Sequence, residues 1–574
     1  MRVSQLHFTI ACGALLLTAQ AGAQTAGISA NLCPRFAPGS TVPQAPDLFS
    51  ANGVLAVNLA YRTFPGSNGS PLYCFTTPDG KESPTLHIYP GDRLVVNVTN
   101  TLPTPTSASS MAPVTTASTV CGAAVQDASS VNVHYHGTNT SPTCHSDEVI
   151  HTLINSGQSF QYTVAFPPDE PPGLYWYHPH VHGLSEAAVQ GGASGAIVVR
   201  GIADLQPAVA GLPEQILIIR DQVTPPDAPP IGSTLPCGGI QPSWDISVNY
   251  VQVLASNCFV PAKLAMRPDQ RQFWRVSNSS ADTILDLQLV YDGVPQTIEV
   301  VGIDGVPTGS QDGTRTGTLI PVTDVLVPPA GRVEFVMTGP AATVRKAIFQ
   351  TLNVDTGPDG DTDPTRPLVA ITTSPSAPGP ALTIGPAGAP GPQRFEGLAT
   401  ATPNITRTLY FSENNPLSQF FITVDGATPL LFSPQNPPAI VTTQGSVEDW
   451  IIQNRSLENH EFHIHQIHFL LLERDGVPVA AQDQQFHDMI DIPYGTGAPP
   501  YPSVKVRMDF RGPDIGDFVY HCHILEHEDD GMMAIIRVLP NPAAARSNSK
   551  PSKAIKAQAK GGAGGSQLAV NWGD

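Results

Sequence analysis

Residues 89–100 read YPGDRLVVNVTN, in which a Pro-Gly turn leads into an apolar run of β-strand character that ends on Asn100. The same pattern returns as RPDQRQFWRVSN at 267–278 and as TQGSVEDWIIQN at 443–454. The closing asparagines are separated by 178 and then by 176 residues. This regular spacing predicts three copies of one β-rich unit.

The composition also favours a mostly β chain of several domains. Only 13% of the 574 residues are charged, while 50 glycines and 58 prolines supply turns between short strands. A chain of this length exceeds what one hydrophobic core usually serves. From breaks in the pattern we expect a first domain at 24–202, a second at 203–373, a Pro/Gly-rich linker at 374–400, a third at 401–540 and a disordered tail at 541–574.

The N-terminus has the pattern of an export signal. Residues 1–23 combine an early Arg2, an apolar run over residues 8–18 and small residues at the end, which predicts a cleaved signal peptide and a secreted or periplasmic protein. No later stretch approaches the ~20 apolar residues that a membrane-spanning helix needs. The net charge of -19 disfavours nucleic acid as a partner, because phosphate is repelled.

The cysteines fit an exported protein. Of the eight, Cys12 should leave with the signal peptide, and Cys522 lies among histidines. Fifteen pairings of the other six are possible, and the sequence does not choose between them. Their spacing favours three local disulfides, which are Cys33 with Cys74, Cys121 with Cys144, and Cys237 with Cys258.

The histidines gather into HxH pairs. Seventeen histidines placed at random would form roughly half a pair, and the chain contains five. Side chains at i and i+2 of a strand project from one face, so each pair can offer two imidazoles to one metal region. Eight imidazoles from four motifs exceed the needs of one metal ion and suit a cluster of three coppers. They are His134, His136, His178, His180, His463, His465, His521 and His523.

The stretch HCHILEHEDDGMM at 521–533 predicts a second site on the same strand. Alternation turns Cys522 away from the face that carries His521 and His523. The thiolate of Cys522 is therefore expected to serve a metal different from the one that its two neighbours bind.

The partners of that thiolate can be chosen from their spacing. His460 lies at an odd offset from His463, so it can leave the cluster, and His527 is within reach of the cysteine after a turn. Two imidazoles, one thiolate and a weak thioether form the trigonal blue-copper arrangement used for electron transfer. Met532 is the expected axial donor, and its competitor Met533 is expected to pack in the core.

The motifs HYHG, HPHVHG, HEFHIHQ and HCHILEHEDDGM resemble those of the multicopper oxidases, the laccase family, in order and in internal spacing. The resemblance covers nearly the whole mature chain. It implies an all-β fold of three cupredoxin-like Greek-key β-barrel or sandwich domains, which agrees with the threefold repeat. The second domain contains no histidine and is expected to bind no copper.

The resemblance also implies four copper ions and their ligands. The type-2 copper would take one histidine from the first motif and one from the third, and the two type-3 coppers would share the other six cluster histidines. By this resemblance the ligands are His134 and His463 for type 2, His136, His178, His180, His465, His521 and His523 for type 3, and His460, Cys522, His527 and Met532 for type 1.

The implied activity is oxidation of a donor one electron at a time at the type-1 copper, coupled to four-electron reduction of dioxygen to water. The HCH tripeptide would then join the two sites covalently. Asp147 resembles the family's acid beside the type-2 water, and Glu528 resembles an acid on the oxygen side. We expect both to supply protons as catalytic residues.

Phenols, aromatic amines and low-valent metal ions all qualify as donors. The main interpretation is a laccase-like oxidase of phenolic or aromatic donors, and the alternative is a metallo-oxidase of Cu(I), Fe(II) or Mn(II), which fits the acidic surface. Eight methionines and no Met-rich segment count against Cu(I). A non-catalytic cupredoxin would not need the full ligand set. In the alternative, His487, Asp488 and Met489 are candidate donors on the type-1 side.

The remaining histidines are expected to play structural roles. His182 continues the HPHVHG strand and is expected to steady a ligand from behind. His468 is expected to be packed, and His87, His145 and His151 are expected to be at the surface or satisfied by neighbours.

Overall fold

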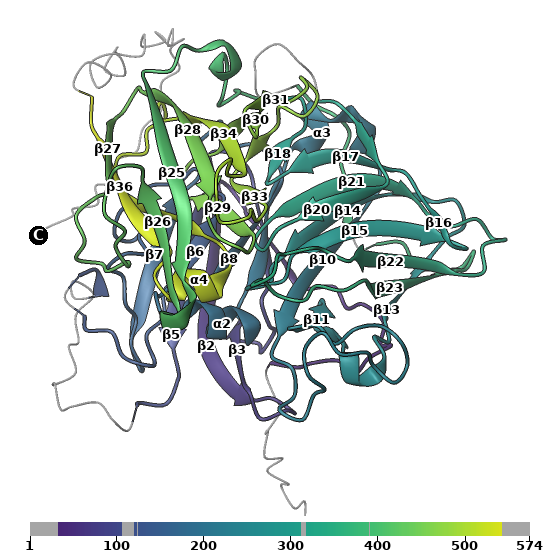
Figure 1. Ribbon diagram of the computed structural model, residues 1–574. Coiled ribbons are helices and arrows are strands. Elements are labelled where there is room, and N and C mark those ends of the chain that lie inside the picture. Colours follow the sequence, from purple (N-terminus) through teal and green to yellow (C-terminus); the bar gives the residue numbers. More distant parts are fainter. Residues whose placement is uncertain are drawn as a thin grey trace, which may run out of the picture. The chain divides into compact units, whose positions relative to one another are not determined.

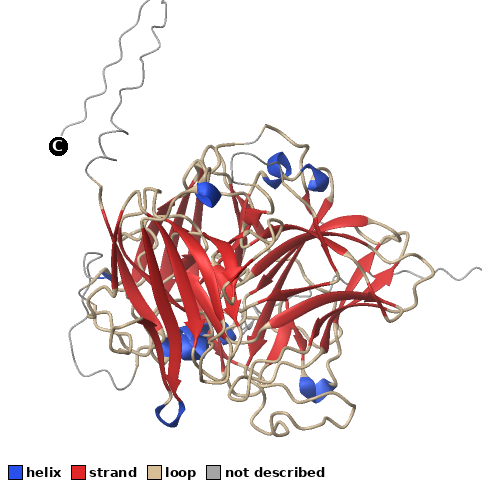
Figure 2. Cartoon of the chain, turned by 45° about the horizontal axis from the view of Figure 1, so that its top comes forward, coloured by secondary structure: helices blue, strands red, loops and turns tan. Residues whose placement is uncertain are grey.

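The structure is a computed structural model that describes residues 33–105, 120–122, 124–310, 317–380, 382–389 and 391–541. Strands dominate and the helices are few and short (Figure 2), so the chain is all-β as predicted. The predicted signal peptide with Cys12, and the tail beyond residue 541, lie outside the described residues. Among the residues described, no helix is long and apolar enough to span a bilayer.

The strands of the described residues form six sheets, two in each of three consecutive stretches of chain (Figure 1). In the first stretch a five-stranded sheet has the order β1 (Asp47–Phe49), β4 (Thr85–Ile88), β9 (Gly195–Val199), β8 (Leu174–His178) and β6 (His134–His136). A four-stranded sheet has the order β3 (Pro71–Thr76), β2 (Val54–Pro65), β5 (Arg93–Asn100) and β7 (Ser159–Ala165).

The second stretch has the largest sheets. Its nine-stranded sheet runs β12 (Val251–Val253), β11 (Asp245–Val248), β10 (Pro213–Gln222), β14 (Arg271–Asn278), β21 (Arg332–Thr338), β17 (Ile298–Ile303) and β18 (Val306–Pro307), with β19 (Ile320–Val322) on β17 and β24 (Leu382–Thr383) on β10. Its six-stranded sheet runs β13 (Ala262–Met266), β23 (Arg366–Thr373), β22 (Ala347–Leu352), β15 (Leu285–Tyr291) and β16 (Val294–Pro295), with β20 (Asp324–Val327) on β15.

The third stretch repeats the plan. Its seven-stranded sheet runs β26 (Gln419–Val424), β25 (Ile405–Asn414), β28 (Val447–Asn454), β34 (Ser503–Asp509), β30 (Phe469–Arg474) and β31 (Val477–Pro478), with β32 (Phe486–His487) on β30. Its five-stranded sheet runs β27 (Ile440–Thr443), β36 (Met533–Leu539), β35 (Gly516–Cys522), β29 (His460–Ile464) and β33 (Met489–Ile492).

The repeated motif forms the same strand in each stretch, namely β5, β14 and β28. Each of these strands lies parallel to an earlier strand, which is β2, β10 or β25. On its other side each pairs antiparallel with a later strand, which is β7, β21 or β34. The prediction of three copies of one β-rich unit is confirmed at the level of strand pairing.

The asparagine that closes each repeat has one structural task. Asn100, Asn278 and Asn454 are fully buried, and each side-chain amide donates to two backbone carbonyl oxygens at 2.6–3.0 Å. Each side-chain oxygen accepts a hydrogen bond from the N–H two residues later. In the third copy this fixes the loop that leads directly into β29 and its histidines.

Each stretch has an apolar core of its own. Val96 belongs to the first core, Trp274 to the second and Trp450 to the third, and all are at most 1% exposed. The third core also contains Cys522 and Met532. The second predicted site is therefore built inside a dry, rigid interior.

Two segments cross the predicted domain limits. Phe36 and Thr41, from the start of the predicted first domain, bridge to Val251 and Lys263 of the second stretch. Within the predicted linker at 374–400, β24 adds an edge strand to β10. Both segments thereby attach neighbouring chain to the second pair of sheets, while the domain limits themselves stay predictions.

The described disulfides confirm the local pairing, because they join Cys33 to Cys74, Cys121 to Cys144, and Cys237 to Cys258. Cys522 is free and buried.

Short helices connect some of the strands. The helices of the described residues are α2 (Ser185–Gln190), α3 (Ile202–Leu205) and α4 (Leu525–Asp529), with 3-10 turns η1 (Pro207–Val209), η2 (Ala255–Asn257), η3 (Leu398–Thr400) and η4 (Asn415–Leu417).

Candidate metal centre

Short strands carry the HxH motifs into the interior. β6 pairs antiparallel with β8, which sets His134 opposite His178. β29 pairs with β35 in the same way and sets His463 opposite His521. All eight predicted cluster histidines are at most 1% exposed. Two sheets from opposite ends of the chain thus each present four of the imidazoles.

The two sets of imidazoles meet. The rings of His134 and His465 stack with centroids 3.8 Å apart, and those of His136 and His463 stack at 4.0 Å. His523 also contacts the first set, with its ring centroid 5.0 Å from that of His136. The structure therefore brings together imidazoles that are more than 300 residues apart in sequence.

Three of the imidazoles converge on one point. The Nε2 atoms of His180, His465 and His521 lie 3.1–3.3 Å from one another. Metal–nitrogen bonds of about 2 Å from a common centre place ligand nitrogens at about this separation. Burial lowers the pKa of His180 to about 3 and holds the pKa of His465 well below its usual value. The rings of His180 and His465 therefore favour the neutral form, which can present a lone pair to a metal.

Backbone and carboxylate oxygens fix the direction of the rings. Nδ1 of His178, His463 and His521 each lies 2.8 Å from a backbone carbonyl oxygen, and Nδ1 of His134 lies 3.0 Å from Oδ1 of Asp147. A protonated Nδ1 that donates to these oxygens leaves Nε2 as the free lone pair. Nε2 of His134, His178 and His463 is buried without a hydrogen-bond partner. The residues present therefore fit a bound metal cluster.

Cys522 faces the opposite way, as strand alternation predicts. Its Sγ lies 3.7 Å from Nδ1 of His460 and 3.7 Å from Nδ1 of His527, and these two nitrogens are 3.1 Å apart. His460 therefore lies beside Cys522 and outside the histidine cluster, as predicted. Met532 is fully buried in the same core, whereas Met533 packs in a separate apolar cluster.

The environment of the thiol also fits a metal. Burial raises the pKa of Cys522 well above its usual value, and the Glu461 backbone N–H lies 3.4 Å from Sγ. Burial likewise lowers the pKa of His527 to about 4. A thiolate in such a dry place needs a cation beside it, and two neutral imidazoles are ready to share that cation.

Two family models describe this chain. Both are multicopper oxidase models, and they match residues 125–204 and 401–542, which contain all the motif histidines. Multicopper oxidase MmcO of Mycobacterium tuberculosis is 24% identical over 91% of this chain and 92% of its own length. The chain belongs to the multicopper oxidase family. The oxidase is thus a copper-dependent oxidoreductase that uses dioxygen as its electron acceptor.

Other relatives agree with this family. The laccase of Bacillus subtilis is 34% identical to the oxidase over 104 residues, which cover 16% of this chain and 20% of the laccase. A multicopper oxidase from Campylobacter jejuni, described as a metallo-oxidase, superposes with a TM-score of 0.63 at 21% identity, covering 88% of this chain and 96% of that one. A laccase-like multicopper oxidase from Ochrobactrum sp. superposes with a TM-score of 0.62 at 20% sequence identity. The match covers 87% of this chain and 100% of that one. These structural matches show the shared cupredoxin-like fold.

Both predicted acids of the oxidase lie against the cluster. Asp147 Oδ1 accepts from the Tyr135 N–H as well as facing His134, and its Oδ2 accepts from Gln466 at 2.6 Å. Glu528, on α4, is fully buried, with a carboxylate oxygen 3.1 Å from Nδ1 of His521. Asp147 lies within hydrogen-bond distance of the predicted copper ligand His134, and Glu528 lies within ion-pair distance of the predicted copper ligand His521.

The prediction that Asp488 lies on the type-1 side is wrong. β33 pairs with β29 in a register that sets Met489 opposite His463, so the preceding carboxylate reaches the cluster side. Asp488 Oδ1 lies 3.3 Å from Nε2 of His136. The sequence also does not identify the partner of Asp488, which forms an ion pair with Arg332 of β21. No sequence pattern marks that arginine.

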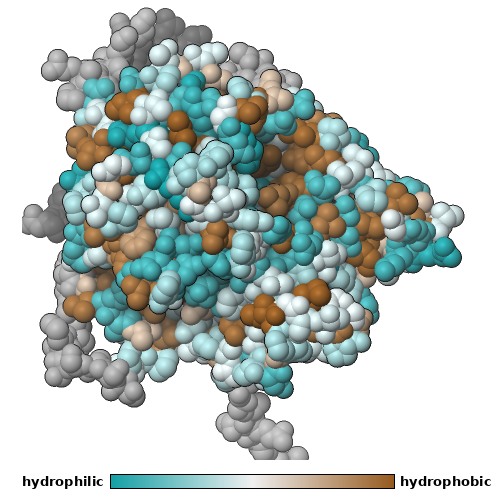
Figure 3. Space-filling model, viewed as in Figure 1, coloured by the Kyte–Doolittle hydropathy of each residue, from teal (hydrophilic) through white to brown (hydrophobic). Residues whose placement is uncertain are grey.

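His487 also lies away from the type-1 site. Its Nδ1 is 3.4 Å from Oδ2 of Asp304, and both residues line a cavity of about 120 Å³ together with Met489. Apolar side chains of β20 form another wall of this cavity. Figure 3 shows a hollow with apolar walls in the region where Figure 1 labels β20 and β33.

The remaining histidines mostly follow their structural predictions. His468 is packed, with Nε2 2.9 Å from the Asp304 carbonyl oxygen, and Nε2 of the buried His87 pairs with Oδ1 of Asp47. His145 and His151 are exposed. His182 is half-buried and meets the ring of Phe432, and its predicted role behind a ligand stays a prediction.

A second cavity lies on the type-1 side of the oxidase. It encloses about 180 Å³, and the candidate ligand His527 forms part of its wall. Glu458 connects the cavity to the candidate ligand His527, because its carboxylate lies 3.4 Å from Nε2 of that histidine. Sequence reasoning missed this cavity because its acids come from separate loops and from helix α4. The carboxylates that line it are Asp282, Asp359, Asp361, Asp363, Glu458 and Glu526.

Proposed function

We propose that the oxidase is a laccase-like enzyme that oxidises phenolic or aromatic donors and reduces dioxygen to water with four copper ions. The observation that carries this proposal is the division of the HCH tripeptide. Cys522 Sγ lies with His460 and His527, while the rings of His521 and His523 lie with the cluster. When bound, the copper ions would accept electrons singly and deliver them to dioxygen.

The ligand roles follow the two groupings. His460, Cys522, His527 and Met532 would hold the electron-entry copper. His134 and His463 would hold the type-2 copper, and the type-3 pair would be held by His136, His178, His180, His465, His521 and His523. The burial of all these side chains and the grouping of their rings support these roles.

Asp147 and Glu528 are proposed to hold and move protons. Asp147 is fixed by three hydrogen bonds, so its carboxylate can hold His134 in one orientation and still stand beside the cluster. Glu528 stands on the other side, between His180 and His521. A positioned acid at this range can assist proton transfer to reduced oxygen.

We further propose export, with residues 1–23 as the cleaved signal. The three described disulfides support this, because such bonds persist in oxidising compartments and are rare in reducing ones. Copper content and disulfide state of the processed protein, recovered from the exported fraction, test the localisation. Retention of residues 1–23 on the active enzyme would contradict it.

The acidic cavity favours a second candidate, oxidation of a low-valent metal ion. Burial, with the neighbouring acidic charges of Asp361, Glu526 and Asp359, raises the pKa of Glu458 to about 7. A cation in the cavity would relieve this crowding of carboxylates. The Campylobacter jejuni relative is described as a metallo-oxidase, whereas the Ochrobactrum relative is described as active on lignin model compounds.

Oxygen consumption with matched donors distinguishes the two candidates. We expect the copper-loaded oxidase to consume oxygen with a methoxyphenol, and a rate above background only with Fe(II), Mn(II) or Cu(I) would favour the metallo-oxidase. In that outcome Glu458→Gln should raise the KM for the metal ion while leaving the copper content unchanged. The exposed Glu396→Gln is the matched control.

A further inference from the structure

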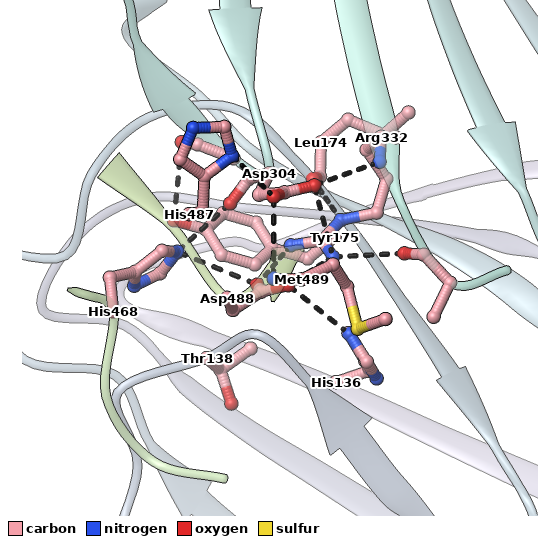
Figure 4. A network of polar contacts seen from close by, with 12 residues as sticks. His136, Thr138, Leu174, Tyr175, Asp304, Arg332, His468, His487, Asp488 and Met489 are labelled. Atoms are coloured by element: carbon pink, nitrogen blue, oxygen red, sulfur yellow. Dashed lines mark hydrogen bonds and ion pairs between the residues drawn. The ribbon is translucent and has the colours of Figure 1, made fainter. Parts of the chain in front are cut away.

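One buried ion pair joins all three stretches of the chain at the cluster (Figure 4). Arg332 begins β21 of the second stretch, and Asp488 belongs to the third. Nη1 of Arg332 donates to Oδ1 of Asp488 at 2.7 Å, and Nη2 donates to Oδ2. The same Oδ1 lies 3.3 Å from Nε2 of His136, in the first stretch. Both charged side chains are fully buried.

His136 differs from His134, His178 and His463 in the nitrogen that it offers. In His134, His178 and His463 the Nδ1 atom is engaged by an oxygen and Nε2 is free. In His136 the Nε2 atom faces Asp488, and Nδ1 is buried without a hydrogen-bond partner. An Nε2–H that donates to the carboxylate leaves Nδ1 as the lone pair for a metal.

Asp488 directs a second ring through its backbone. Its carbonyl oxygen accepts a hydrogen bond from Nδ1 of His463 at 2.8 Å. The side chain of one residue therefore sets His136, and its main chain sets His463. A displacement of Asp488 would disturb ligands from both histidine-bearing sheets at once.

The guanidinium of Arg332 holds this carboxylate in place. Its other contacts are to the carbonyl oxygens of Ala330 at 2.9 Å and Leu174 at 3.2 Å, and to Asp304 at 3.6 Å. Bidentate pairing, with Nε and Nη1 also bonded to backbone carbonyl oxygens, gives one orientation, and a buried carboxylate without such a partner would be costly. The histidine-free second stretch thereby reaches the cluster.

The glycine of the HYHG motif packs closely against the ion pair of Arg332 and Asp488. Gly137 has a φ of +80°, and a Cβ built on it would overlap both Asp488 Oδ2 and Arg332 Nη2. The backbone immediately after His136 therefore lies directly against the ion pair. Only glycine provides both the conformation and the space.

We infer that Arg332 and Asp488 are positioning residues that select the Nδ1 lone pair of His136 and orient His463 for the copper cluster. The inference rests on the proposed ligand roles of these histidines. Neither residue lies in the blue-copper site, so their effect should be confined to the cluster. Loss of such a supporting partner typically weakens metal affinity by about 10- to 100-fold.

The test compares Arg332→Gln and Asp488→Asn with Arg275→Gln. Arg275 is a matched control, because it is also fully buried on the nine-stranded sheet and pairs with Glu214 and Glu334 away from the histidines. Copper titration is followed at the visible thiolate band, the near-ultraviolet band and the type-2 electron paramagnetic resonance signal. We expect the first two variants to lose cluster affinity by about 10- to 100-fold with the visible band intact.

Two further measurements keep the inference open to refutation if a single variant folds poorly. The double variant Arg332→Gln with Asp488→Asn removes both charges and avoids an unpaired one, and it should still lose cluster affinity. Histidine-selective nitrogen-15 spectra of the metal-free protein should show the Nε2–H tautomer of His136, and this tautomer should be lost in Asp488→Leu, which offers no acceptor.

Unchanged cluster affinity in the two variants would overturn the inference. Equal loss of the visible thiolate band and of the cluster signals would also overturn it, because that is the pattern of general destabilisation for which Arg275→Gln is the control. Failure of the unmodified protein to bind any cluster copper would instead overturn the proposed function.

Discussion

Replacing Asp147 by asparagine separates proton supply from cluster geometry. The asparagine oxygen can keep both bonds of Oδ1, to His134 and to the Tyr135 N–H, but its amide group would face the amide of Gln466. Oε1 of Gln466 has no hydrogen-bond partner, so a flip of that side chain restores the third bond. Asp147→Asn therefore retains the geometry and loses only the ionisable group.

The structure sets the magnitudes. Asp147→Ala would leave three buried donors without acceptors, at about 1–3 kcal/mol each, whereas Asp147→Asn should cost below about 1 kcal/mol. Loss of a positioned general acid typically lowers the rate by about 10²- to 10⁴-fold. We expect oxygen turnover of Asp147→Asn to fall by at least about 100-fold at full copper content.

The assay is steady-state oxygen consumption across pH, with copper content and both absorption bands measured on the same samples. Asp147→Ala serves as the structural comparison, and it should also lose stability and cluster copper. If Asp147→Asn turned over oxygen like the unmodified enzyme at every pH with copper content full, Asp147 would not be a proton donor.

Three other predictions concern stability. Asn278→Ala removes three buried hydrogen bonds and should lower the free energy of unfolding in urea by about 2–4 kcal/mol, with copper content unchanged; a loss below about 0.5 kcal/mol would contradict its role. Burial raises the pKa of Glu170 from 4.5 to about 7, so the unfolded chain loses this proton first and stability falls as pH rises through that range. Glu170→Gln should therefore flatten the melting temperature between these pH values, and an unchanged slope would refute this. Removal of copper by a chelator should lower the melting temperature, reversibly on copper addition, because copper binds only the folded chain.

Strand pattern made much of the fold predictable. The repeat at 89–100 marked β5, and its two later copies marked β14 and β28, because the turn residues and the closing asparagine act locally. The attachment of Phe36 to Val251 could not be read in this way. Such pairing depends on contacts more than 200 residues apart, for which single strands carry no signal.

The candidate site divides in a similar manner. The i, i+2 offsets and the odd offset of His460 follow from strand geometry, so they placed imidazoles and thiolate on the correct faces. Asp488 and Arg332 are 156 residues apart and meet only after two stretches have packed. The acidic cavity likewise gathers Asp359 and Glu458 from separate loops. Charge alone in the sequence indicated an acidic surface without its location.

The most direct test of the central claim, that one strand joins an electron-entry site to an oxygen-reducing cluster, is the copper spectrum and activity of Cys522→Ser. This change removes the thiolate and leaves the flanking His521 and His523 in place. We predict loss of the visible blue band and of donor-driven oxygen consumption, with the near-ultraviolet and type-2 signals of the cluster retained. Donor-driven oxygen consumption at the unmodified rate, or a blue band that survives, would contradict the account.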